Sequence, residues 1–143
     1  MRRFRMSTTA FAALLFILAL AGSVWAHHSI QSQFDIHRSV SVSGTVAKVE
    51  FINPHSYLTV NVKSADGTIQ KWAFEMGALG NLRRAGLSRT DRGGLKAGDE
   101  VTITALPARD GSHSGLLQEL KIADGRVYKF SADAAGNVEQ TGK

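Results

Sequence analysis

Histidine is the residue type in this chain with the most specific chemistry, because the sequence has five histidines and no cysteine. Without thiols, a disulfide framework, a cysteine-based zinc site, an iron–sulfur cluster and a thiol nucleophile are excluded. A transition metal would have to be bound by nitrogen ligands, which histidine supplies. The main candidates for such a role are His27, His28, His55 and His113.

The role of His27 depends on the segment before it. Three arginines precede an apolar run at residues 10–21, and small residues lead to Ala26. This pattern is typical of a secretory signal peptide cleaved after Ala26. The apolar run is shorter than the ~20 residues of a membrane-spanning helix, which disfavours the alternative of an uncleaved anchor. The sequence therefore predicts a signal peptide at 1–26, a periplasmic protein, and no stable membrane insertion after cleavage.

A chain that begins at His27 has a chelating N-terminus. The α-amine and the ring Nδ1 of an N-terminal histidine bind one metal ion together, and an α-amine has a pKa of about 7.7 to 8, so a metal displaces its proton near neutral pH. Nitrogen donors of this kind favour Cu(II) among divalent ions. With a further nitrogen from His28, His37, His55 or His113, the sequence predicts a copper site. The alternative is a solvated N-terminus without metal.

His55 and His113 fall in two predicted loops. His55 follows Asn53-Pro54, a dipeptide that favours a rigid turn. His113 lies in a polar loop at 109–115. In the fold predicted below, both loops border the same ligand-binding face, so we expect the two histidines to approach each other. The alternatives are a turn histidine with structural hydrogen bonds and a solvated loop histidine.

Four other residues are candidates for ligand contacts. Glu75 would orient a histidine through a hydrogen bond to its second ring nitrogen. Tyr57 would stack on a sugar or a base, and Arg83 and Arg84 would bind an anionic group. The alternatives are an exposed strand residue, rim packing and a solvated helix face. Because the sequence lacks a Ser–His–Asp signature and a phosphate-binding loop, it predicts no catalytic residues.

Alternating apolar residues predict the strands that must position these side chains. The predicted strands are residues 39–52, 57–63, 69–76, 101–106, 116–122 and 127–130. A short helix is predicted within 77–87, ending near Gly86. In the first strand the apolar positions change parity after Gly44, so that Ala47 and Val49 become the inward residues. This change predicts a β-bulge or a sharp bend at the glycine.

Three strands, a short helix and two or three further strands is the order of an oligonucleotide/oligosaccharide-binding (OB) barrel. The sequence therefore predicts a mainly β protein, a small OB-like β-barrel of five to six strands with one short helix between strands 3 and 4. An N-terminal arm at 27–38 precedes the barrel at 39–130, and a flexible tail follows at 131–143. Another small barrel or an open α+β sheet is the alternative.

The net charge bears on the class of partner. The formal charge of the whole chain is +5. Removal of residues 1–26 takes away three arginines and leaves 14 basic against 12 acidic residues, a net charge of +2. The basic balance comes mostly from the export signal, so nucleic acid is not a predicted partner.

Several short motifs follow one another along the chain: HHSIQSQFD, SGTVAKVEFINPH, ADGTIQKWAFEMG, LKAGDEVTITA, ARDGS and IADGR. Together they resemble a family of small exported bacterial proteins with a domain of unknown function, over residues 27–130. The resemblance implies export and an OB-type barrel, and it marks His27, His28 and His55 as motif residues. Members of that family often have Trp where Phe51 stands. The resemblance implies no particular activity.

Two functions from different classes follow from these observations. The first is a non-enzymatic periplasmic protein that binds copper through His27, with His55 or His28 as a further ligand, and buffers or delivers the metal. The second is a metal-free OB-type module that binds a peptide, a saccharide or another cell-envelope component through its loop face. A copper-dependent oxidase is the third hypothesis. It ranks last because it would also require an open coordination position and a substrate face, and the sequence shows neither.

Overall fold

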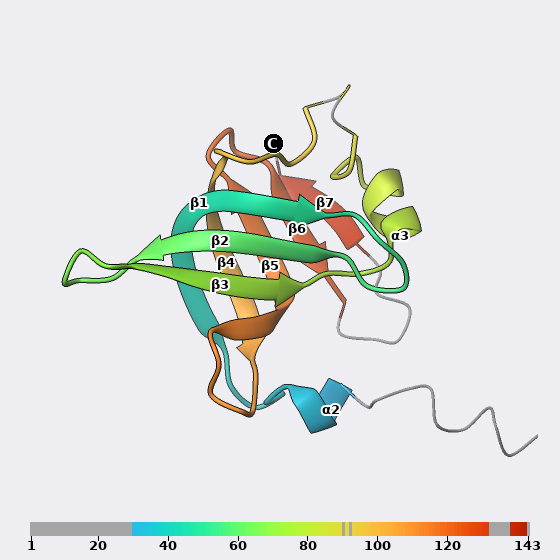
Figure 1. The fold of residues 1–143 in the computed structure, drawn as a ribbon. Helices are drawn as coiled ribbons and strands as arrows, with labels where there is room; N and C mark the ends of the chain where they lie inside the picture. Colours follow the sequence, from blue (N-terminus) through green and yellow to red (C-terminus); the bar gives the residue numbers. More distant parts are fainter. Residues whose placement is uncertain (1–29, 90, 92, 132–137, 143) are drawn as a thin grey trace, which may run out of the picture.

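The computed structural model describes residues 30–89, 91, 93–131 and 138–142 (Figure 1). The predicted signal peptide, His27 and His28 lie outside the described residues. The elements, in chain order, are α2 (Ile30–Gln33), β1 (Val40–Glu50), β2 (Tyr57–Lys63), β3 (Ile69–Glu75), α3 (Leu79–Arg84), β4 (Glu100–Pro107), β5 (Ser114–Ile122), β6 (Val127–Phe130) and β7 (Val138–Gly142). No helix in these ranges is long and apolar enough to cross a membrane.

The first five strands form a closed barrel. β1 pairs antiparallel with β4 along its first half and with β2 along its second half. β2 pairs antiparallel with β3, and β4 with β5. The barrel closes through a parallel pairing of β3 with β5. This is OB connectivity, and the short helix α3 stands between β3 and β4, so the predicted fold class is confirmed.

The strands whose bounds were predicted most accurately are those in which apolar and polar residues alternate. In β2, Leu58 and Val60 are buried while Tyr57 and Thr59 face outward. The hairpin to β3 turns at Gly67, whose φ of 87° favours glycine. The predicted bounds of β2 and β6 agree with the structure, whereas β4 and β5 each extend one or two residues further than predicted.

The parity change in β1 lies at a different residue from the one predicted. The inward series continues through Gly44 to Val46, which is buried, and the register shifts between Val46 and Lys48. Gly44 has a different structural role, because it lies where the pairing partner of β1 changes from β4 to β2. A Cβ at this position would lie 2.3 Å from the carbonyl oxygen of Asn61, so only glycine permits the close approach of the two backbones.

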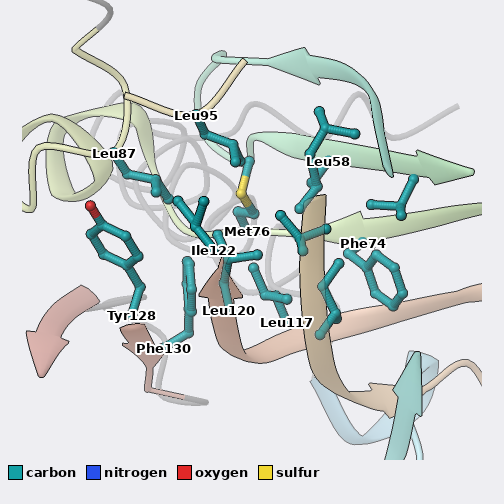
Figure 2. Close-up of a cluster of buried hydrophobic side chains, with 14 of the residues drawn as sticks. Leu58, Phe74, Met76, Leu87, Leu95, Leu117, Leu120, Ile122, Tyr128 and Phe130 are labelled. Carbon is teal, nitrogen blue, oxygen red and sulfur yellow. The ribbon is translucent and has the colours of Figure 1, made fainter. Parts of the chain in front are cut away.

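The hydrophobic core fills the barrel and continues under α3 and β6 (Figure 2). Leu82 and Leu87 come from the helix and the loop after it, and Tyr128 and Phe130 come from β6. Full burial of a side chain of this size contributes about 1.5–3 kcal/mol to stability. The core thus fixes the barrel and its two covering elements as one unit.

The prediction of a flexible tail at 131–143 is wrong for residues 138–142. Residues 138–142 form β7, which pairs antiparallel with β6. Glu139, Gln140 and Thr141 are exposed, so this strand carries no alternating apolar pattern. It forms because β6 presents an open edge, and a register with that edge cannot be recognised from hydrophobicity.

Candidate functional site

A pocket of about 660 Å³ lies where the N-terminal arm crosses the barrel. Its walls come from the arm, from β2 and β3, from the start of β5, and from the loop between β4 and β5. Tyr57 and Glu75 are opposite each other in the β2–β3 register, and both point away from the core residues Leu58 and Phe74. The pocket therefore lies on the outer face of the barrel, beside the closing β3–β5 pairing.

The arm is held in place by the β4–β5 loop. The Nε of Arg109 donates to the carbonyl oxygens of Gln31 and Phe34 at 2.8 and 3.2 Å. The backbone N–H of Arg109 donates to the carbonyl of Gln33 at 2.9 Å, and Phe34 forms a β-bridge with Ala108. Phe34 is only 7% exposed. The described part of the arm, from Ile30 onward, thus lies against the barrel, and it contains one helical turn, α2, that was not predicted.

Tyr57 and Glu75 form the polar side of the pocket. The Glu75 side chain is 17% exposed, and its burial raises the pKa of this carboxyl, while the charge of His55 acts in the opposite direction. Burial also raises the pKa of the Tyr57 phenol, and the negative charge of Glu75 adds to this shift. Tyr57 nevertheless keeps 37% of its surface exposed, so its ring is accessible to a ligand.

His55 contacts Glu75 from the loop between β1 and β2. Its Nδ1 lies 2.7 Å from Oε1 of Glu75, and the imidazole is 55% exposed. With the proton on Nδ1, the ring donates to the carboxylate, and Nε2 keeps its lone pair. This is the arrangement in which a carboxylate orients a histidine that binds a metal or accepts a proton.

The loop that carries His55 is fixed at several points. The Ser56 hydroxyl donates to the carbonyl of Ile52 at 3.0 Å, and Ser56 is fully buried. The side-chain oxygen of Asn53 accepts from the backbone N–H of Leu79 at 3.2 Å, at the start of α3. The Asn53–Pro54 peptide bond is cis. The turn predicted at Asn53-Pro54 is present, and the two hydrogen bonds hold it against its neighbours.

His113 has a different environment. Its ring stacks on Trp72, with centroids 4.9 Å apart, and Trp72 in turn stacks on Phe74 at 5.9 Å. The carbonyl oxygen of His113 accepts from the backbone N–H of Ala73 at 3.0 Å. Because residues 72 and 75 differ in parity along β3, His55 and His113 contact opposite faces of this strand. The structure does not bring them together in the way we predicted.

The arginines predicted to bind an anion lie elsewhere. Arg83 and Arg84 are exposed on the last turn of α3, where Arg84 donates to the side chain of Asn81. Neither lines the pocket. The arginine that does is Arg109, which the sequence reasoning treated only as part of a polar loop. Its position at the end of the fourth strand, in a loop expected to border the ligand face, was the available signal.

The metal ligands predicted at the N-terminus, His27 and His28, lie outside the described residues. Within the part of the chain that the structure describes, no three His, Asp or Glu side chains gather in a way that could hold a metal ion. His55 and Glu75 contact each other, and no third side chain of these types joins them among the described residues.

Comparison with protein families matches residues 13–119 to the model of a family of unknown function, DUF6152. A search of curated proteins finds no match.

Proposed function

Because the chain belongs to this family of unknown function, we propose a function from its own site: an exported, non-enzymatic binding protein that holds a polar ligand in the pocket under the arm. The ligand is a small molecule or a group on a cell-envelope partner. The observation that carries the proposal is the pocket itself, since about 660 Å³ falls within the range of small-molecule sites. Export rests on the signal-like segment at residues 1–26 and on the motif order.

The lining of the pocket supports binding of a polar ligand. Tyr57 presents an aromatic face, Glu75 and Asp110 present carboxylates, and Arg109 presents a guanidinium. Sites of this kind combine an apolar wall with a few placed polar groups that fix the orientation of the ligand. In OB barrels, the face beside the β1–β2 and β4–β5 loops is the common ligand face. Here the β4–β5 loop lines the pocket, and His55 of the β1–β2 loop contacts Glu75 in its wall.

Native mass spectrometry of the protein isolated from the periplasm tests the proposal. We expect a bound molecule on the unaltered protein and on Ile69→Ala, a control on the β2–β3 hairpin where Ile69 is 60% exposed outside the pocket. Tyr57→Ala should reduce the occupied fraction roughly tenfold, because the ring loses its contact with the ligand. Equal occupancy in the two variants, or no bound molecule in any sample, would contradict a ligand site in this pocket.

A second function, copper binding, is favoured by the contact between His55 and Glu75. The carboxylate holds Nδ1 and leaves Nε2 as the coordinating atom. His27 precedes the first residue of α2 by three positions, a span of at most about 10 Å. We propose that the α-amine and Nδ1 of His27 chelate Cu(II), with His55 or His28 as a further ligand and His113 as a weaker candidate.

Copper binding is tested by Cu(II) titration of processed protein, after intact-mass measurement has shown whether the chain begins at His27. One glycine inserted before His27 should weaken binding at least tenfold, because it removes the chelate ring, and His55→Ala should weaken it less. Ile69→Ala is the control, since Ile69 is 60% exposed on the β2–β3 hairpin and has no metal-binding group. Unchanged affinity after the glycine insertion would rule out the chelate.

A further inference from the structure

The seam between β3 and β5 gives the pocket a side made of small residues. Ala73 pairs with Ser114, and Phe74 pairs with Gly115, in the parallel ladder that closes the barrel. Gly115 cannot be replaced without a shift, because a Cβ there would lie 2.7 Å from the carbonyl oxygen of Leu106. Beside these small residues, Tyr57 contributes a partly exposed ring. The Tyr57 ring and the small residues of the seam thus line the same pocket.

Each charged group of the pocket is held by a bond to a neighbour. Glu75 contacts Nδ1 of His55 at 2.7 Å. Asp110 accepts from the backbone N–H of Ser112 at 2.9 Å, and Arg109 donates its Nε to two carbonyl oxygens of the arm. The groups are therefore positioned before a ligand arrives, which lowers the entropy cost of binding.

The signs of these charges restrict the class of ligand. Two carboxylates, Glu75 and Asp110, disfavour a polyanion such as nucleic acid. The guanidinium of Arg109, next to Asp110 in the chain, disfavours a polyamine. An apolar ligand would remove water from all three charged groups and would supply no hydrogen bonds in place of those lost. A neutral ligand with many hydroxyl groups meets none of these penalties, because each hydroxyl both donates and accepts.

We propose that the pocket binds a neutral saccharide. The face of a sugar ring packs on Tyr57 and the seam, hydroxyl groups donate to Glu75 and Asp110, and Arg109 donates to hydroxyl or ring oxygens. The proposal rests on the proposed function, since it names the ligand class of the same pocket. A peptide, a polyamine and an oligonucleotide are the competing ligands.

The experiment is a titration of the isotope-labelled exported protein, arm included, followed by amide NMR spectra. The neutral probes are maltotriose, cellotriose and the trimer of N-acetylglucosamine. The competing probes are trialanine, spermidine and a short oligothymidylate. We expect at least one neutral trisaccharide to shift the amides of Tyr57, Ala73 and Gly115, with a Kd on the order of 1 mM or tighter. The amide of Ile69, on the distant hairpin, should stay in place.

Variants decide whether the shifts report the proposed contacts. Tyr57→Ala should weaken saccharide binding roughly tenfold, and Asp110→Ala, on an exposed loop where folding is least at risk, roughly threefold or more. Ile69→Ala is the matched control and should bind as the unaltered protein does. If Tyr57→Ala does not fold, Asp110→Ala alone carries the test.

Two results would overturn the saccharide. One is that none of the three trisaccharides shifts the pocket amides, and the other is that they bind with unchanged affinity to both pocket variants. If trialanine or spermidine shifts the same amides instead, the ligand class is wrong while the pocket remains a binding site. Failure of the proposed function itself has a different signature, which is the absence of a Tyr57-dependent bound molecule on the periplasmic protein.

Discussion

Two loops of this barrel each carry a histidine, and the two side chains have opposite kinds of contact. His55, between β1 and β2, reaches the carboxylate of Glu75 on the outer face of β3. His113, between β4 and β5, covers the ring of Trp72, which packs against the core. The first contact is polar and borders the pocket, while the second extends a stack of aromatic rings.

The difference shows that strand parity decides what a loop histidine does. Residues 72 and 75 are three positions apart on β3, so one belongs to the core side and the other to the pocket side. Equal residue type and similar loop position gave the same expectation for both histidines. Of these two histidines, His113 stacks on an aromatic ring, whereas His55 contacts a carboxylate that lines the pocket, and three experiments test this distinction.

The largest effect is expected where the aromatic stack meets the core. Trp72→Ala removes the partner of both His113 and Phe74 and leaves a cavity, so it should lower the free energy of unfolding by about 3 kcal/mol. Urea denaturation measures the change. Trp72→Phe keeps a ring in the stack and should cost clearly less. A loss below about 1 kcal/mol for Trp72→Ala would show that the stack contributes little.

A smaller effect should separate the two histidines directly. His113→Ala removes one ring from the stack and should cost about 1 kcal/mol. His55→Ala removes a half-exposed side chain and should change stability by no more than about 0.5 kcal/mol, while it alters the pocket side of β3. Equal losses for the two variants in the same urea series would remove the distinction between a structural and a ligand-facing histidine.

The smallest effect concerns the pH dependence of stability. Because burial raises the pKa of Glu75, the folded protein holds this proton more tightly than the unfolded chain does. Stability should therefore fall as pH rises from the ordinary value of 4.5 through the raised pKa. Glu75→Gln should remove that part of the fall. His55→Ala should enlarge it, since the charge of His55 opposes the shift.

Unfolding titrations at a series of pH values measure this component. Glu50→Gln serves as the matched control, because Glu50 is also a strand glutamate but pairs with Lys48 at the surface. A pH profile that Glu75→Gln leaves unchanged would mean that the Glu75 carboxyl ionises as readily in the folded protein as in the unfolded chain.

Much of the fold was predictable because local patterns determine it. The alternation of Leu58 and Val60 with outward residues, and the Asp66-Gly67 turn, give the bounds of β2 and its hairpin. The bulge in β1 was assigned to Gly44 because the apolar pattern shows that parity changes but not where. Its position at Val46 depends on two partner strands, which only the folded barrel defines.

The site was less predictable, because it depends on pairings between distant residues. The opposition of Tyr57 and Glu75 follows from the β2–β3 register, and the contact of Glu75 with His55 follows from that opposition and the loop geometry. The arm becomes a pocket wall through the bridge from Phe34 to Ala108. An isolated phenylalanine in a polar segment indicates burial, but its partner cannot be read from the sequence.

The closing ladder between β3 and β5 is the shortest in the barrel, with three residue pairs where β2 and β3 share seven. Local opening in proteins needs little free energy where few contacts hold an element, so we expect this ladder to open more readily than the longer ones. Its amides are then the ones whose hydrogen exchange a bound molecule would slow most. The same short ladder that completes the barrel makes occupancy of the pocket measurable as protection of the backbone beside it.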